Sequence, residues 1–504
     1  MKEQKDFFGI KKAGSTVKTE VFAGIVTFLA MSYILTVNPN QMLNFNLTDV
    51  RWPSVFLATA IGAVIGTLLM AFLAKMPYAQ ASGMGLNSMV GAIIGGSMGF
   101  AYTLGNALLI IFIDGILFLL VSIIPIGRDK ETKKLITLRE KIFDGMPKVV
   151  RTSITVGIGL FIAFIGMQNA HIIVDNPYTL VEFVNLAGKD AWAAGGAARS
   201  AIVALFGLFV IAVLENFKVK GSVIIGILAA TILSIPLGVT DINILLGKTG
   251  GVTWKFWENF ANFFSFDAEK GGVFFSAFTE GLNFPEGSFF TTLMLIITFA
   301  MIDMFDTMGT VVGCATNAGL IDENGKPLAY DKIMYSDSIA TCAGALLGTS
   351  TVTTFVESGA GVAAGGRTGL TALVTAILFF LSIFLMPLFA FIPSAAAASA
   401  LIYVGVLMMS NVKNVDFSSV KNSIPAFLTI IVMLLGYSIT KGIGVGLLSY
   451  VILASIIYVI DIIKYAAAKK NNPEIEKPVW EVSIVAIVVS CLFLIYFLVP
   501  TIIK

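Results

Sequence analysis

Long runs of apolar residues, separated by short polar stretches, form the main pattern of this chain. A hydrocarbon core about 30 Å thick needs about 20 apolar residues in a helix, so each run predicts a membrane-spanning segment. The runs give fifteen candidates, near 21–37, 55–74, 84–100, 103–124, 150–168, 198–217, 220–238, 289–313, 334–349, 355–366, 368–392, 396–411, 423–439, 442–463 and 480–499. Three of them (84–100, 334–349 and 355–366) are short or interrupted by glycine, which is unusual for helices in lipid.

One arrangement of segments occurs in both halves of the chain. "PYAQASGMGLNSMVGAIIGG" precedes the apolar run "LGNALLIIFIDGILFLL", and "GTSTVTTFVESGAGVAAGGR" precedes "TGLTALVTAILFFLSIFL". Each copy has a β-prone lead, a glycine-rich half-span with one polar residue (Asn87 or Glu357), and a full helix. Seven spans separate the copies, so this pattern predicts two halves that run in opposite directions. Chance similarity between glycine-rich apolar segments is the alternative.

Composition supports a polytopic, all-α membrane protein. Hydrophobic residues make up 57% of the chain, charged residues 13%, and the mean hydropathy is +0.90. A net charge of +2 gives no reason to expect a nucleic-acid partner. His171 is the one histidine, which excludes a multi-histidine zinc site. Cys314, Cys342 and Cys491 have no paired spacing, so we interpret them as packing residues.

Basic residues in the loops predict the orientation, because cytoplasmic loops are rich in Lys and Arg. The segments 1–20 and 125–151 are predicted to be cytoplasmic, and 239–288, where six acids outnumber three lysines, is predicted to be external. The basic residues on the predicted cytoplasmic side are Lys2, Lys5, Lys11, Lys12, Lys18, Arg128, Lys130, Lys133, Lys134, Arg139, Lys141, Lys148, Arg151, Lys218, Lys220, Arg367, Lys413, Lys421, Lys464, Lys469 and Lys470. In the external segment, "VTWKFWENFANFF" is amphipathic and predicts either a helix at the membrane interface or a packed loop helix.

Four carboxylates lie well inside the apolar runs: Asp114, Asp303, Asp306 and Glu357. An ionised carboxylate at mid-bilayer costs at least about 2.5 to 3.5 kcal/mol, so each should face a cavity or a partner, or carry a proton. None has a basic partner at the same depth. Protonation or a polar ligand is therefore the expected compensation, and it would couple ligand binding to proton uptake.

Asp303 and Asp306 are three residues apart, so on a helix they project to one face, with Thr307 and Thr310 nearby. The alternative is a helix-terminal pair that reaches toward water. For Asp114, a structural hydrogen bond to a neighbouring helix explains the residue at least as well as a functional role.

Glu357 stands between a β-branched stretch, "STVTTFV", and the small residues of "ESGAGVAAGG". This order predicts a chain that enters as a short strand and continues as a half-helix, with free N–H groups available to a polar ligand in the membrane. Two such broken spans at equivalent places are typical of a transporter site. A helix-packing face rich in small residues is the alternative.

Four motifs resemble one known family: "VFAGIVTFLAMSYILTVNP", "GMGLN", "DMFDTMGT" and "TVTTFVESGAGVAAGGRTGLTA". They are similar to the azaguanine-type hypoxanthine/guanine/adenine permeases, a branch of the nucleobase:cation symporters in the xanthine/uracil permease superfamily. The resemblance implies about 14 transmembrane spans as two inverted repeats of seven, divided into core and gate domains, with short strands in spans 3 and 10. It also implies purine uptake driven by a proton, with no other cofactor.

The resemblance implies a role for each residue at the site. Glu357 would hydrogen-bond the base, Asp306 would be the eighth-span carboxylate with Asp303 beside it, and Asn87 would be the third-span polar residue. Phe355 would flank the ring, and the main chain near Val356 would donate or accept a hydrogen bond. The predicted substrate site is Glu357, Asp306, Asp303, Asn87, Phe355, Val356 and Thr310, and the predicted proton-coupling residues are Asp306, Asp303 and Glu357.

The predicted organisation is a cytoplasmic tail (1–20), a first repeat (21–238), an external loop (239–288), a second repeat (289–463), and a cytoplasmic loop with an extra apolar segment (464–504). We expect a multi-pass protein of the cell membrane that acts on a small purine base, and a homodimer is left open. Two alternatives are a carrier of another solute, such as uracil, xanthine or an anion, and an intramembrane aspartyl hydrolase. The hydrolase is disfavoured because Asp303 and Asp306 share one helix.

Overall fold

The computed structural model describes residues 6–46, 49–96, 99–128, 135–176, 178–193, 195–246, 252–322, 327–469 and 477–502. Lys2, Lys5, Lys130, Lys133, Lys134 and Lys470, which entered the predicted orientation, lie outside these ranges. In the described part, nine helices are long and apolar enough to cross a membrane, which confirms a polytopic helical protein. The chain divides into two compact units, and each is described separately below.

Unit 1 comprises Met1–Ser122, Ile162–Ser288 and Phe299–Val404, and unit 2 comprises Ile123–Phe161, Phe289–Thr298 and Gly405–Lys504. The helices of unit 1, or with most of their length in it, are α1 (Val17–Met31), α2 (Ile34–Met42), α3 (Trp52–Leu69), α4 (Met84–Ile94), α5 (Leu104–Ile123), α8 (Ala197–Asn216), α9 (Ser222–Ser234), α10 (Ile242–Leu245), α11 (Phe256–Phe263), α12 (Ser276–Thr279), α13 (Phe289–Ala318), α14 (Tyr330–Leu347), α15 (Ser358–Ala363), α16 (Gly369–Ser382), α17 (Met386–Ala390) and α18 (Ser394–Met409). Its strands are β1 (Gln80–Ser82), β4 (Ile173–Asn176), β5 (Leu180–Phe183) and β6 (Val352–Thr354).

Two broken spans meet at the strands β1 and β6. The two strands are antiparallel, with Gln80 opposite Thr354 and Ser82 opposite Val352. Each strand leads into a short helix, β1 into α4 and β6 into α15. The predicted strand and half-helix in both spans are therefore confirmed, and the antiparallel pairing is what two halves of opposite direction would produce.

The two polar residues of the predicted repeat lie at different places relative to their half-helices. The central residues of the two strands, Ala81 and Thr353, are opposite each other and 272 positions apart, whereas Asn87 and Glu357 are 270 apart. Glu357 is the residue that precedes α15, while Asn87 lies inside α4. The separation of paired residues differs at each position of an antiparallel pair, so the correspondence of Asn87 and Glu357 stays a prediction.

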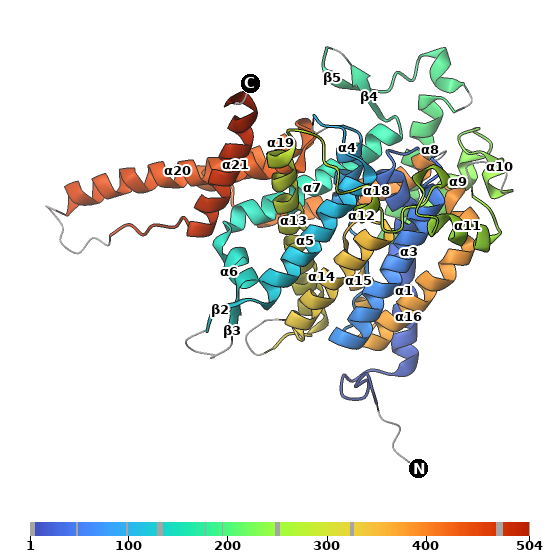
Figure 1. The fold of residues 1–504 in the computed structure, drawn as a ribbon, viewed down its shortest axis with the longest axis horizontal. Helices are drawn as coiled ribbons and strands as arrows, with labels where there is room; N and C mark the ends of the chain where they lie inside the picture. The colour runs from blue at the N-terminus through green and yellow to red at the C-terminus, as the bar shows by residue number, and fades with distance from the viewer. Residues whose placement is uncertain are drawn as a thin grey trace. The chain divides into compact units, whose positions relative to one another are not determined.

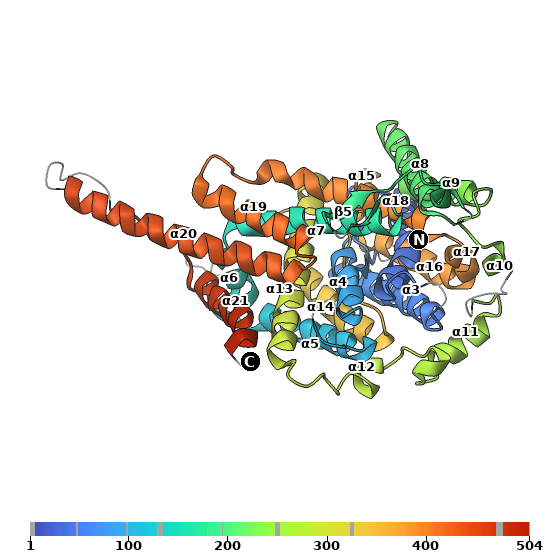
Figure 2. The ribbon, with the colours of Figure 1, turned by 90° about the horizontal axis from the view of Figure 1, so that it is seen from above.

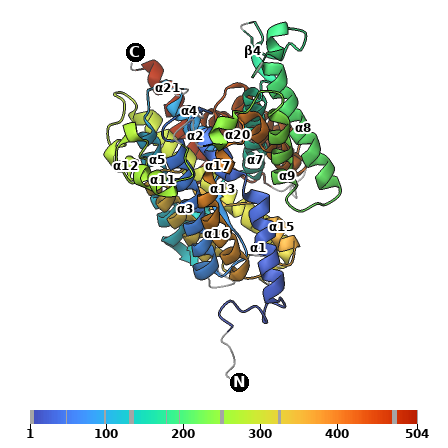
Figure 3. The same cartoon turned by 90° about the vertical axis from the view of Figure 1, so that its right-hand side faces the viewer.

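Helices α1, α3 and α16 lie side by side in unit 1 (Figure 1 and Figure 3). Small residues allow this packing: a Cβ at Gly24 of α1 would lie 2.6 Å from the Val374 Cβ of α16. Helix α1 begins at Val17, earlier than the predicted residue 21, because Thr16 caps it. Glu20, assigned to the tail, is instead fully buried in this helix.

The Glu20 carboxylate joins α1 to the start of α16. It accepts hydrogen bonds from the main-chain N–H of Arg367 (3.1 Å), the main-chain N–H of Thr368 (3.2 Å) and the Thr371 hydroxyl (2.6 Å). These donors include the free N–H groups at a helix start, which a carboxylate stabilises. The loop after α15 is thus held against the first helix.

The amphipathic stretch of the external segment forms α11. Phe263 and Asn259 are buried, whereas Trp254, Phe256 and Trp257 are about half exposed, so the helix packs on one side and presents aromatic side chains on the other. The predicted helix is confirmed. Its buried side fits a packed loop helix, and its exposed aromatic side chains fit a helix at the membrane interface.

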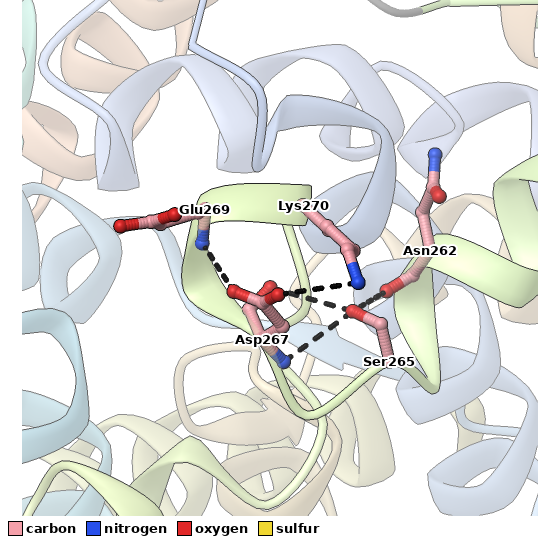
Figure 4. Close-up of polar contacts among 5 residues, drawn as sticks. All are labelled: Asn262, Ser265, Asp267, Glu269 and Lys270. Atoms are coloured by element: carbon pink, nitrogen blue, oxygen red, sulfur yellow. Dashed lines mark hydrogen bonds and ion pairs between the residues drawn. The ribbon is translucent and has the colours of Figure 1, made fainter.

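A compact turn follows α11 (Figure 4). The Ser265 hydroxyl donates to the Asn262 carbonyl at 2.7 Å, and the Glu269 N–H donates to Asp267 at 3.0 Å. The ammonium of Lys270 lies 3.5 Å from the Asp267 carboxylate. These local contacts order the connection between α11 and α12.

Unit 2 holds a hairpin, β2 (Pro125–Arg128) and β3 (Leu135–Thr137), and the helices α6 (Leu138–Gly145), α19 (Val420–Leu435), α20 (Ile439–Ala468) and α21 (Ile484–Ile502), with most of α7 (Lys148–Asn169). Helices α19 and α20 pack along each other (Figure 2). Gly446 of α20 lies against Thr429 of α19, where any side chain would collide with the threonine. The extra apolar segment predicted at 480–499 is the helix α21.

Candidate functional site

The end of β6 and the start of α15 form the centre of the candidate site. The Phe355 N–H donates to the Ala79 carbonyl at 3.0 Å, which extends the strand pairing by one residue. Phe355 is buried, and the next residue, Val356, is half exposed. In the described part of the chain, the main-chain N–H of Val356 has no hydrogen-bond acceptor. This N–H is therefore available to a ligand, and the contact with a ligand near Val356 stays a prediction.

Glu357 has one carboxylate oxygen engaged and one free. The Tyr33 hydroxyl donates to Glu357 Oε1 at 2.5 Å. Tyr33 is fully buried at the break between α1 and α2. Among the described residues, Glu357 Oε2 has no hydrogen-bond partner, although it is shielded from solvent. A hydroxyl thus orients the carboxylate and leaves an acceptor for a ligand.

Asp306 of α13 is the second carboxylate at this site. It is partly buried, and no donor within the described ranges reaches its carboxylate. It interacts electrostatically with Glu357, so the structure brings these two predicted residues together. Thr310, one helical turn further along α13, is almost fully buried.

Asp303 lies in different surroundings from Asp306, although both are on α13. It is fully buried, and its Oδ2 accepts a hydrogen bond from the Thr341 hydroxyl of α14 at 3.0 Å. Its other oxygen has no partner among the described residues. The structure places Asp303 against α14 rather than beside Glu357.

Asn87 ties the two broken spans together. Its side-chain oxygen accepts a short hydrogen bond from the Ser350 hydroxyl, and its amide nitrogen donates to the Ser82 carbonyl at 3.3 Å. The residue is fully buried. One N–H and one oxygen lone pair of the amide are not used by these two contacts, so a ligand that reached this buried group could still bind it.

Asp337 of α14 is a polar residue that the sequence interpretation missed. Its carboxylate accepts four hydrogen bonds: from Gln80 Nε2 (2.9 Å), the Thr354 N–H (2.9 Å), the Thr354 hydroxyl (2.8 Å) and the Thr307 hydroxyl (2.8 Å). It therefore fastens both strands to α13 and α14. Asp337 lies within the candidate segment 334–349, so the statement that only four carboxylates lie inside the spans was incomplete.

The chemistry available at the site is that of hydrogen-bond acceptors beside a buried aromatic ring. Glu357 and Asp306 supply carboxylate oxygens, Val356 supplies an N–H, and Phe355 supplies the ring. In the described ranges, no Lys, Arg or His contacts the two carboxylates. The described residues also contain no group of His, Cys, Asp and Glu that could hold a metal ion.

Known relatives cover most of the chain. The adenine permease AdeP of Escherichia coli (strain K12) is 36% identical over 447 residues, covering 88% of this chain and 89% of the relative. The guanine/hypoxanthine permease PbuG of Bacillus subtilis (strain 168) is 34% identical over 453 residues, covering 88% of this chain and 92% of the relative.

A solved structure shares the fold. The transmembrane domain of a cyanobacterium bicarbonate transporter, BicA, superposes with a TM-score of 0.56 at 15% identity, covering 84% of this chain and 97% of that domain. The profile of the family described as "Permease family" matches residues 18–445, from α1 into α20. These relatives are transporters rather than enzymes. The chain belongs to this permease family, the xanthine/uracil permease superfamily.

Proposed function

We propose that this protein imports a purine nucleobase by proton symport, with hypoxanthine and guanine as the main substrates and adenine as a further one. The names of the relatives support this choice, since they include adenine permeases and guanine/hypoxanthine permeases at 34–36% identity. Because both purine types occur among relatives of similar identity, identity alone does not rank the bases.

The observation that carries the proposal is the interacting pair of carboxylates, Glu357 and Asp306. Within the described ranges, Glu357 Oε2 and the N–H of the preceding residue, Val356, have no hydrogen-bond partner. A neutral purine offers ring N–H donors to carboxylates, and its ring nitrogens or exocyclic oxygen can accept from a main-chain N–H. Phe355 provides an apolar surface beside this site for the flat ring.

The charge of the site argues against an anionic substrate. Two carboxylates without a basic neighbour in the described part repel anions, so a phosphorylated nucleotide or bicarbonate fits poorly. The likeness to the bicarbonate transporter therefore concerns the fold and not the ligand.

Proton symport follows from the same two groups. Two carboxylates that interact at a buried site cannot both remain ionised without cost, so one proton bound between them is favourable. A proton taken up with the base would neutralise the site during transport. We further propose a cell-membrane location with the N-terminal side in the cytoplasm; a homodimer is compatible with this function.

Uptake of labelled hypoxanthine by cells that lack their own purine permeases tests the proposal. Glu357→Gln keeps the size of the side chain and removes the charge, and we expect uptake to fall by about 10- to 150-fold, the value of a charged hydrogen bond. Glu269→Gln, the same change at an exposed external residue, is the matched control.

Competition then identifies the substrate class. Unlabelled guanine, adenine, xanthine and uracil are added at two pH values, and the purines named above should compete best, with faster uptake at the lower external pH. Full uptake by Glu357→Gln would refute the site. Competition by uracil as strong as that by hypoxanthine would favour the alternative carrier.

A further inference from the structure

A second group of buried carboxyls lies away from Glu357. Asp114 of α5, Asp303 of α13 and Asp337 of α14 are all fully buried, and they interact electrostatically with one another. We call these three residues the acidic triad. They come from three helices of unit 1, α5, α13 and α14.

The contact between α5 and α14 fixes Asp114 in this place. Gly115 allows the contact, because a Cβ there would lie 2.6 Å from the Cys342 Sγ and 3.2 Å from the Ser338 carbonyl. Thr341, between these two residues of α14, donates to Asp303. Asp114 is thus held against the turn of α14 that also binds Asp303.

The three carboxyls differ in how many donors reach them. Asp337 accepts four hydrogen bonds, whereas Asp303 accepts one from Thr341 and has the Thr353 hydroxyl as a further polar neighbour. In the described part of the chain, both oxygens of Asp114 and Oδ1 of Asp303 lack any partner. The protein therefore provides donors for one ionised carboxylate, Asp337, and leaves the other two without the solvation that an ionised group needs.

The surroundings contain no positive charge that could compensate. Helix α14 adds the Cys342 thiol, and α13 adds Asp306, which interacts with Asp337; α5 adds only Asp114. No Lys, Arg or His within the described ranges faces the triad. The described residues also form no metal-holding group, which leaves protons as the cations that fit.

We propose that the acidic triad is a proton-binding site separate from the substrate carboxylates, with exchangeable protons on Asp114 and Asp303. Asp337 links the triad to the substrate site, because Thr354, which donates to it twice, is the last residue of β6 and is followed by Phe355 and Val356. Gain or loss of a triad proton changes the charge beside Asp337 and so shifts β6, the strand that leads to Glu357. The coupling role rests on the proposed purine symport, whereas proton binding itself does not.

Infrared spectroscopy of the purified protein tests proton binding without any substrate. A protonated carboxyl in dry surroundings has a carbonyl band that shifts in heavy water. Asp114→Asn should remove one such band, Asp114→Glu should restore it at a changed position, and Asp175→Asn, at an exposed residue of β4, should leave it unchanged. Identical carboxyl bands in wild type and Asp114→Asn would overturn the proposal.

Proteoliposomes test the coupling. With 100 mV across the membrane, one proton per base supports accumulation of roughly 50-fold. For Asp114→Asn, which keeps Glu357 and Asp306, we expect hypoxanthine exchange to persist. The proton-to-base ratio, measured with a pH dye inside the vesicles, and the accumulation of hypoxanthine should both fall below the wild-type values.

The two proposals fail in distinguishable ways. If wild type neither binds nor exchanges a purine, the proposed function fails, while the infrared result still decides the proton site. If Asp114→Asn does not fold, Asp114→Glu and Asp303→Asn take its place in both assays. Acidification by Asp114→Asn at the wild-type proton-to-base ratio would refute the coupling role.

Discussion

Replacing Tyr33 by phenylalanine tests the hydrogen bond to Glu357, although the same hydroxyl also lies 3.3 Å from the Met84 Sδ. The change removes a single oxygen, the hydroxyl that donates to Glu357 Oε1 at 2.5 Å, and leaves the buried ring in place. A hydrogen bond to a charged group contributes about 1.5 to 3 kcal/mol. Without this donor the Glu357 carboxylate is less well oriented and less stable when ionised.

If the base binds the ionised, oriented Glu357 carboxylate, the free energy of the hydrogen bond from Tyr33 converts directly into binding affinity. At 1.36 kcal/mol per tenfold change, Tyr33→Phe should weaken hypoxanthine binding by about 10- to 150-fold. Titration calorimetry of the purified protein measures this ratio. Thermal unfolding in the same detergent shows whether the variant stays folded.

Tyr78→Phe is the matched control. Tyr78 is also fully buried, but its hydroxyl has no hydrogen-bond partner in the described part of the chain. Its removal should leave hypoxanthine binding close to wild type. If both variants bind equally well, or if Tyr33→Phe binds as tightly as wild type, the reasoning about Glu357 is wrong.

Three further predictions concern stability, each measured by thermal unfolding in detergent. Asp337→Asn places an amide N–H against hydrogen-bond donors and should lower the free energy of unfolding by more than about 3 kcal/mol. The same change at the exposed Asp175 should lower it little. Equal unfolding midpoints for the two variants would contradict the role of the four hydrogen bonds. Glu20→Gln should lower the free energy of unfolding by about 1 to 2 kcal/mol, because it weakens the hydrogen bonds at the start of α16. An unchanged midpoint would show that these hydrogen bonds do not contribute to stability. In the loop before α3, burial raises the pKa of Asp49 but the Arg51 guanidinium and N–H lower it more, so the net pKa lies below the usual value. This stabilisation is present above the unfolded pKa of about 3.9 and is lost as the pH falls through the folded pKa. Asp49→Asn should therefore lower the unfolding midpoint at pH 7, and the difference from wild type should disappear in acid below the folded pKa. A difference that persisted in acid would argue against the ion pair.

The broken spans were predictable because two local signals coincide there. A β-branched run before Glu357 favours a strand, and the following Gly and Ala residues favour a short, closely packed helix. Both signals are local in the sequence and do not depend on contacts between distant residues. The register was not predictable, because only the pairing of Ala81 with Thr353 fixes it.

The partners of the site residues were harder to predict. Tyr33 looks like an ordinary aromatic residue of an apolar run. Its hydroxyl donates to Glu357, which is 324 positions away in the sequence. Asp337 stands between two serines in a weakly apolar segment, so the charge resembles part of a loop. Its function becomes visible only when Thr354 and Gln80 are seen to donate to it.

The strand pair has a consequence for how the protein is made. Strand β1 is complete at Ser82, but its partner β6 is not synthesised until Thr354. Unpaired strand N–H and C=O groups are costly in lipid. During synthesis, the N–H and C=O groups of β1 therefore need polar partners, such as water or the insertion machinery, until more than 260 further residues have been made. A chain stopped after its first half would carry an open strand edge in the membrane, with its N–H and C=O groups unpaired.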